Sequence, residues 1–169
     1  LAKDRKLDDP FVMVGGPCAY NSEPLADFVD IVILGEGEEV NLEVLNVYKE
    51  WKKNKTTRED FLMMASKIEG VYIPSFYDVT YNEDKTVKET IPNRDGIPAN
   101  PRKRIIKNMD EVPYPEALIV PYIETVHERV VLELFRGCTR GCRFCQAGMI
   151  YRPIREKNLD TLTKSVREL

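Results

Sequence analysis

Three of the four cysteines lie close together in the chain, with three and then two residues between them: Cys138, Cys142 and Cys145. Thiolates are soft ligands that suit zinc or an iron–sulfur cluster. Three of them on one loop can hold three irons of a four-iron cluster and leave the fourth iron open. A closed zinc site needs a fourth ligand, and no Cys or His follows Cys145. We therefore expect a metal-binding loop, which Gly137 and Gly141 allow to turn tightly.

This spacing, with the aromatic Phe144 directly before the last cysteine, resembles the radical SAM (S-adenosylmethionine) enzymes. The resemblance implies a [4Fe-4S] cluster on Cys138, Cys142 and Cys145, whose open iron binds SAM. It also implies reductive cleavage of SAM to a 5'-deoxyadenosyl radical, with Phe144 against the adenine. The expected enzyme is an oxidoreductase or transferase of unknown substrate, which receives electrons from a donor such as flavodoxin or ferredoxin. The 169-residue chain alone is expected to be inactive.

Other readings of the cysteines remain open. The loop suits a zinc knuckle that takes Cys18 or His127 as a fourth ligand, or a redox-active thiol cluster. The whole chain would then be a non-catalytic α/β binding module. His127, the single histidine, either lines the site or packs at the rim of a barrel. For Cys18 we expect a small, buried, hydrophobic role.

The cysteines lie in a strongly basic segment. Five arginines and no acidic residue occur from Arg136 to Arg155, whereas the whole chain has 25 basic and 28 acidic residues. Nearby arginines lower the cost of holding a negatively charged cluster. Alternatively, one of these arginines contacts a substrate phosphate or the SAM carboxylate. A third alternative is that it is simply part of a solvated loop.

The composition limits the classes of protein to which this chain can belong. A chain of 169 residues that is 43% hydrophobic can form one or two domains. It has no apolar run that could span a membrane, and a pI near 5.4 argues against a general nucleic-acid binder. Clustered cysteines favour metal binding in a reducing cytoplasm over disulfides. The first residue is Leu1, so we expect the sequence to be a segment of a longer protein.

Two short apolar runs, 11–14 and 30–34, each lead into glycines. Such runs predict parallel strands buried on both faces of a doubly wound α/β sheet, whose ligands bind beyond the carboxyl ends of the strands. The pattern resembles the C-terminal part of the cobalamin-binding-like, Rossmann-type domain that precedes many radical SAM barrels. Whether cobalamin itself binds is left open. The resemblance implies cofactor contacts at the glycines after these runs: Gly15, Gly16, Gly35 and Gly37.

Two helices should follow. The first, over 38–51, has an apolar stripe that predicts one buried face. The second begins after Thr57, which with Asp60 forms a partial capping box, and should end at Gly70. The stripe of the first helix consists of Val40, Val44, Val47 and Trp51.

From residue 71 onward, the pattern of hydrophobic residues is no longer that of a helix. Residues 71–81 and 86–91 predict a β-hairpin, and 104–107 a short strand. Prolines stiffen a connector in which we place a boundary between about 113 and 122. The expected domains are 1–70, the cobalamin-binding-like part; 71–122, the hairpin and connector; and 123–169, the first β/α unit of a partial TIM barrel.

In that unit, a strand over 129–135 should lead into the cysteines, and a helix should occupy about 159–169. An unpaired strand edge is a template for pairing. We therefore expect the segment 130–135 to join the N-terminal sheet or hairpin, or to pair with a second copy in a homodimer.

Overall fold

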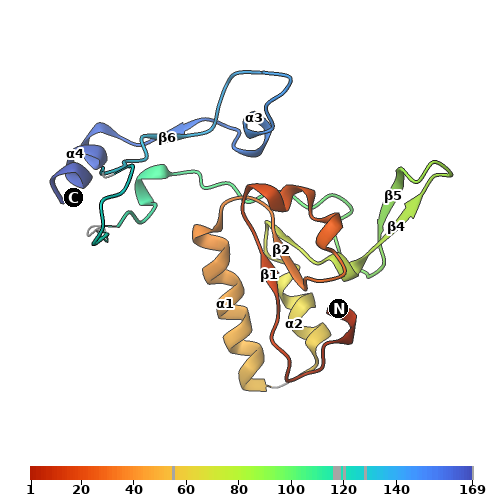
Figure 1. The fold of residues 1–169 in the computed structure, drawn as a ribbon. Helices are drawn as coiled ribbons and strands as arrows, with labels where there is room; N and C mark the ends of the chain where they lie inside the picture. The colour runs from red at the N-terminus through yellow and green to blue at the C-terminus, as the bar shows by residue number, and fades with distance from the viewer. Residues whose placement is uncertain (55, 116–118, 120, 128, 169) are drawn as a thin grey trace. The chain divides into compact units, whose positions relative to one another are not determined.

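The computed structural model describes residues 1–54, 56–115, 119, 121–127 and 129–168. The chain forms two compact units, a first unit of Leu1–Ile105 and a second unit of Ile106–Leu169 (Figure 1). The sequence placed a boundary later, between about 113 and 122. In the structure the hairpin and the stretch up to Ile105 belong to the first unit. No helix of the described part is both long and apolar enough to cross a membrane.

The first unit contains a three-stranded sheet in the order β1 (Met13–Val14), β2 (Ile31–Ile33), β3 (Val71–Tyr72). β1 and β2 are parallel, which confirms the α/β class, but β3 is antiparallel to β2. A wholly parallel sheet is therefore wrong. For β3 to be parallel, the chain would have to return to the end of the sheet where β2 begins, as it does after a single crossover helix. Here two successive helices follow β2, and they return the chain to the end of the sheet where β2 finishes.

The two helices of this unit are α1 (Gly37–Asn54) and α2 (Arg58–Ala65). The predicted stripe is confirmed, since α1 buries Val40, Val44 and Trp51. The predicted capping box is also present: the Thr57 hydroxyl accepts from the Asp60 amide at 3.1 Å, and the Asp60 carboxylate accepts from the Thr57 amide at 2.9 Å. α2 ends at Ala65, earlier than predicted.

The helices and the N-terminal segment meet in a group of aromatic rings. The centroid of Phe11 lies 4.4 Å from that of Phe61 and 5.4 Å from that of Trp51. The indole N–H of Trp51 donates to the carbonyl of Thr57 at 2.8 Å. The Arg58 guanidinium lies over the Phe11 ring, 3.8 Å from its centroid. These aromatic contacts join α1, α2 and the segment that leads into β1 in one core.

Asp30, directly before β2, is buried and accepts three hydrogen bonds. Its carboxylate accepts from Arg5 at 2.9 Å, from Arg58 at 3.1 Å and from the Val12 amide at 2.7 Å. The segment 1–10 contains one described 3-10 turn, η1 (Ala2–Asp4). The Arg5–Asp30 contact ties this segment to the sheet. Two further 3-10 turns, η2 (Pro17–Asn21) and η3 (Glu23–Leu25), follow β1.

The predicted hairpin is confirmed for β4 (Tyr77–Tyr81) and β5 (Val87–Pro92), which pair antiparallel and follow the turn η4 (Pro74–Phe76). The earlier part of that prediction is wrong, because 71–72 form β3. β3 gains a buried position beside β2, whereas most of the hairpin is exposed.

The second unit contains η5 (Met109–Glu111), β6 (Phe135–Arg136), α3 (Ala147–Ile150), β7 (Arg155–Glu156) and α4 (Leu159–Glu168). α4 confirms the predicted helix up to 168. The predicted strand over 129–135 is wrong except at its last residue, because β6 has two residues and pairs with β7. Val130 and Val131 are 57% and 65% exposed. The expected pairing of 130–135 with the N-terminal sheet or hairpin, or with a second copy, stays a prediction.

Candidate functional site

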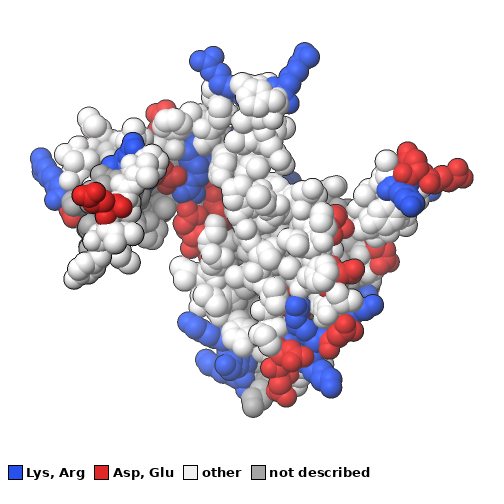
Figure 2. Space-filling model, viewed as in Figure 1, with Lys and Arg blue, Asp and Glu red and all other residues white. Residues whose placement is uncertain are grey.

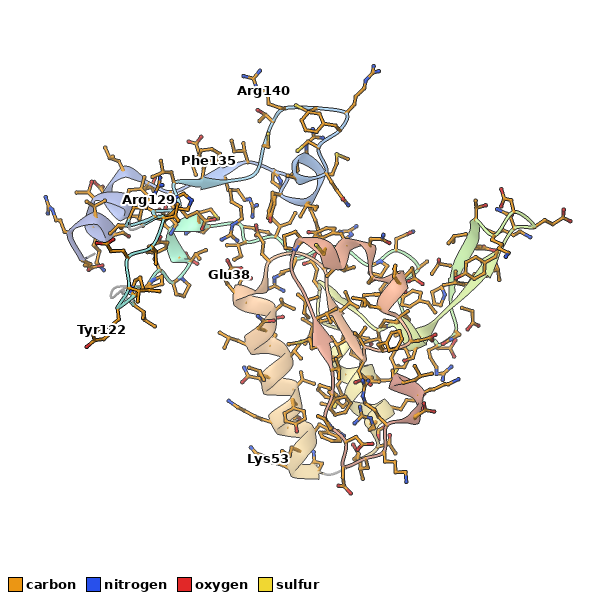
Figure 3. All side chains as sticks on the ribbon, in the orientation of Figure 1. Glu38, Lys53, Tyr122, Arg129, Phe135 and Arg140 are labelled. Carbon is orange, nitrogen blue, oxygen red and sulfur yellow. The ribbon has the colours of Figure 1, made fainter. Side chains whose placement is uncertain are left out.

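The cysteines lie on a loop whose two ends are joined. β6 and β7 bring Arg136 opposite Arg155, and we call the intervening residues 137–154 the cysteine loop. Gly137 has φ +108°, and a Cβ added there would lie 2.5 Å from the Pro153 carbonyl oxygen. The Arg152–Pro153 peptide bond is cis. Glycine is needed where the two ends of the loop cross. In Figure 3 the loop runs outward from Phe135 to Arg140.

Backbone acceptors hold the interior of the loop. The Arg152 guanidinium donates to the Arg140 carbonyl at 3.2 Å, and the Cys145 amide donates to the Cys142 carbonyl at 3.1 Å. At the base, Arg155 donates to the carbonyls of three residues: Pro153 at 3.0 Å, Tyr151 at 3.3 Å and Ile106 at 2.8 Å. These bonds fix the returning end of the loop independently of the cysteine side chains.

All the cysteines are free thiols; Cys138 and Cys145 are half-buried and Cys142 is exposed. Cys142 and Cys145 line one cavity of about 470 Å³, together with Phe144. Cys138 does not line it. Among the described residues, no three Cys, His, Asp or Glu side chains are gathered closely enough to hold a metal ion. The donor set suits a soft metal, and its role as a ligand set stays a prediction.

The other candidates from the cysteine analysis lie in different settings. Phe144 is 93% exposed, so its ring face is open. His127 is exposed, with Nδ1 2.6 Å from the Arg129 guanidinium. Cys18 is exposed on η2, so the expected buried role is wrong. The physical reason is that the 3-10 turn η2 buries only Ala19 and leaves Cys18 toward solvent.

At the end of β2, Gly35 has a structural explanation. Its φ is +111°, and an added Cβ would lie 2.2 Å from the Arg104 carbonyl oxygen. The Arg104 amide donates to Leu34 at 2.8 Å, and Arg104 accepts from the Glu36 amide at 3.1 Å. The predicted strand at 104–107 is reduced to this one bridge. The cofactor contacts proposed for Gly15, Gly16, Gly35 and Gly37 remain predictions.

Sequence reasoning missed the ion pairs that hold Arg104 at this point. Its guanidinium lies 2.6 Å from a Glu39 oxygen and 2.7 Å from a Glu43 oxygen. These two carboxylates raise the pKa of Arg104, with the Glu39 hydrogen bond as the largest cause. The available signal was the spacing: Glu39 and Glu43 are four apart on one helix and therefore share a face.

Comparison with known proteins gives two matches. Residues 1–74 match the family model described as radical SAM proteins, N-terminal. A curated protein of Methanocaldococcus jannaschii, described as uncharacterized, is 31% identical over 167 residues, which cover 96% of this chain and 29% of that relative. The chain thus spans less than a third of the relative's length. No solved structure matches this chain. The first 74 residues of the chain are similar to the N-terminal region of radical SAM proteins.

Proposed function

We propose that this chain is part of a radical SAM enzyme and that Cys138, Cys142 and Cys145 hold its [4Fe-4S] cluster. Two separate parts of the chain support the same class. The family model matches only residues 1–74, whereas the cysteine spacing lies wholly outside that match. The carrying observation is the cysteine loop itself: three free thiols on a segment with closed ends and no acidic residue.

The chain's own residues have distinct proposed tasks. The thiols bind the cluster, and the arginines of the loop lower the cost of its negative charge. The exposed ring of Phe144 provides a face for the adenine of SAM. When bound, the cluster would supply the electron for cleavage of SAM; the protein contributes binding and orientation. For ligation, Cys138 has to approach Cys142 and Cys145, while β6 and β7 keep the ends of the loop together.

The rest of the proposal concerns the whole protein. We infer that the first unit corresponds to a cobalamin-binding-like domain, and we leave its cofactor unassigned. Electrons would come from a donor such as flavodoxin or ferredoxin. Pairing of two copies through the exposed segment 130–135 also stays a proposal, because its side chains Val130, Val131 and Leu134 are more than half exposed.

The test is anaerobic reconstitution of the 169-residue chain with iron and sulfide. About four irons and four sulfides per chain are expected, with a reduced-cluster signal in electron paramagnetic resonance. Changing Cys138, Cys142 or Cys145 singly to Ala should abolish this iron content. Cys18→Ala is the matched control and should retain it. One bound zinc per chain, or loss of the metal in Cys18→Ala, would instead favour a structural zinc module.

A further inference from the structure

The five arginines of the basic segment divide into two groups. Arg136 is paired with Glu133 through two hydrogen bonds of 2.9 Å. Arg152 donates to the Arg140 carbonyl, and Arg155 to three carbonyls at the base of the loop. These three guanidiniums hold the cysteine loop in shape. Each of these three side chains therefore has a structural role.

Arg140 and Arg143 differ. Within the part of the chain that the structure describes, neither guanidinium forms an ion pair or a hydrogen bond. Both residues are exposed and both line the cavity of about 470 Å³ that Cys142 and Cys145 share. The Arg140 side chain points away from the loop into solvent (Figure 3). In the space-filling view, basic side chains project at this tip without acidic atoms beside them (Figure 2).

Three arginines of the first unit, in contrast, are paired with carboxylates. There, Arg58 lies 3.1 Å from Asp30, Arg94 lies 2.9 Å from Glu59, and Arg104 contacts two glutamates. The chain carries a net charge of -3, so acidic partners are plentiful. Arg140 and Arg143 line the same cavity as Arg152, and no carboxylate is among its lining residues, so this part of the loop carries positive charge that attracts an anion.

We propose that Arg140 and Arg143 together bind a phosphate group of the substrate; this rests on the proposed function of the loop. The planar guanidinium fork matches phosphate oxygens, and two such forks match the charge of a phosphate monoester, about −1.5 to −2. The same site takes two adjacent phosphodiesters of a single RNA strand. Phosphate is therefore the shared chemistry, and its source is either a small phosphorylated molecule or an RNA backbone.

Binding should be measured with two probes on the 169-residue chain, both without metal and after reconstitution. The first is a fluorescein-labelled uridine octamer, followed by anisotropy at several salt concentrations. The second is ribose 5-phosphate, followed by ³¹P line broadening and by competition with the octamer. With two phosphate contacts, the octamer should show a log–log salt slope of about −1.4. A slope near zero is expected for Arg140→Ala/Arg143→Ala, with about tenfold weaker binding of the preferred probe.

The matched control is Lys53→Ala/Lys88→Ala, which removes the same charge at two exposed positions of the first unit. It should bind like the wild type. Line broadening by ribose 5-phosphate that only the arginine variant loses identifies a small phosphorylated substrate; arginine-dependent binding of the octamer alone identifies RNA. No binding of either probe, or equal binding by the two double variants, would overturn the proposal. Because the chain is also measured without metal, these results are independent of whether a cluster forms.

Discussion

Gly137 and Pro153 cross so closely that a Cβ on the glycine would lie 2.5 Å from the proline carbonyl oxygen. The crossing sits directly beside β6 and β7, where Arg136 faces Arg155. It joins the two ends of the cysteine loop next to two strands of two residues each. The position of the thiols relative to one another therefore depends on a residue without a side chain.

Gly137→Ala should disturb this crossing. Its φ of +108° is unfavourable for any residue with a Cβ, at about 1–2 kcal/mol, and the steric overlap adds to this cost. We expect a large loss of iron uptake on reconstitution and faster proteolysis within 137–154. Gly141→Ala is the control, since an added Cβ there meets no atom within 4 Å. Equal iron uptake by the two variants would show that the crossing is dispensable.

Gly35→Ala tests the corresponding contact in the first unit. The added Cβ would lie 2.2 Å from the Arg104 carbonyl oxygen, so the bridge between Gly35 and Arg104 should break. We expect the free energy of unfolding to fall by more than about 1 kcal/mol, measured by urea titration of Trp51 fluorescence. Gly15→Ala has only an ordinary contact, 3.4 Å from Ile33 Cβ, and should change the midpoint little.

Asp30→Asn removes the charge that Arg5 and Arg58 share. The Asp30 side chain is only 4% exposed, while the two arginines are 20% and 13% exposed. We expect a loss of about 2–3 kcal/mol, below that for a fully buried pair because the arginines retain some water. The same Trp51 titration measures it. Asp27→Asn, at an exposed position, is the control; a similar loss in both variants would contradict the assigned role of Asp30.

Thr57→Ala removes half of the capping box. Loss of such a cap costs about 1 kcal/mol, and Thr57→Ser, which keeps the hydroxyl, should restore most of it. Chemical denaturation of the two variants and the wild type, with Trp51 as the reporter, decides the outcome. Failure of the serine to recover stability would mean that the methyl group of the threonine, not its hydroxyl, matters.

The cap also predicts a pH dependence. Hydrogen bonds from the side chain and then the backbone amide of Thr57 lower the pKa of Asp60 below its ordinary 3.8. Since the folded-state pKa is depressed, the contribution of the charged form is present above pH 3.8 and is lost as the pH falls through the lower, folded-state value. The stability difference between wild type and Asp60→Asn should shrink over that acidic range. An unchanged difference at pH 2–3 would contradict this assignment.

Features set by neighbours in the sequence could be predicted. The buried stripe of α1 follows from a helical repeat, and the Thr57–Asp60 cap from residues three apart. The hairpin follows from two strands joined by a short turn. In each case the partners are within a few turns or residues of one another, so local pattern and local contact coincide.

Features that depend on residues far apart in the sequence could not be predicted. The direction of β3 depends on how two helices return the chain to β2, and the strand expected over 129–135 lacks a partner along most of its length. Arg104 reaches the end of β2 across many intervening residues. At the candidate site, the sequence proposed the three thiols and Phe144, whose roles stay predictions, whereas the crossing of Gly137 and Pro153 required coordinates.

The closed base of the cysteine loop also changes the entropy of assembling a metal site. In a free chain, bringing three distant ligands together restricts the whole intervening segment, and this cost grows with the logarithm of its length, by about 0.6 kcal/mol per doubling. Here β6, β7 and the Gly137 crossing have already restricted both ends of the segment. Only the short stretch from Cys138 to Cys145 has to rearrange, so a cluster would meet a segment in which much of the loop-closure entropy has been lost during folding.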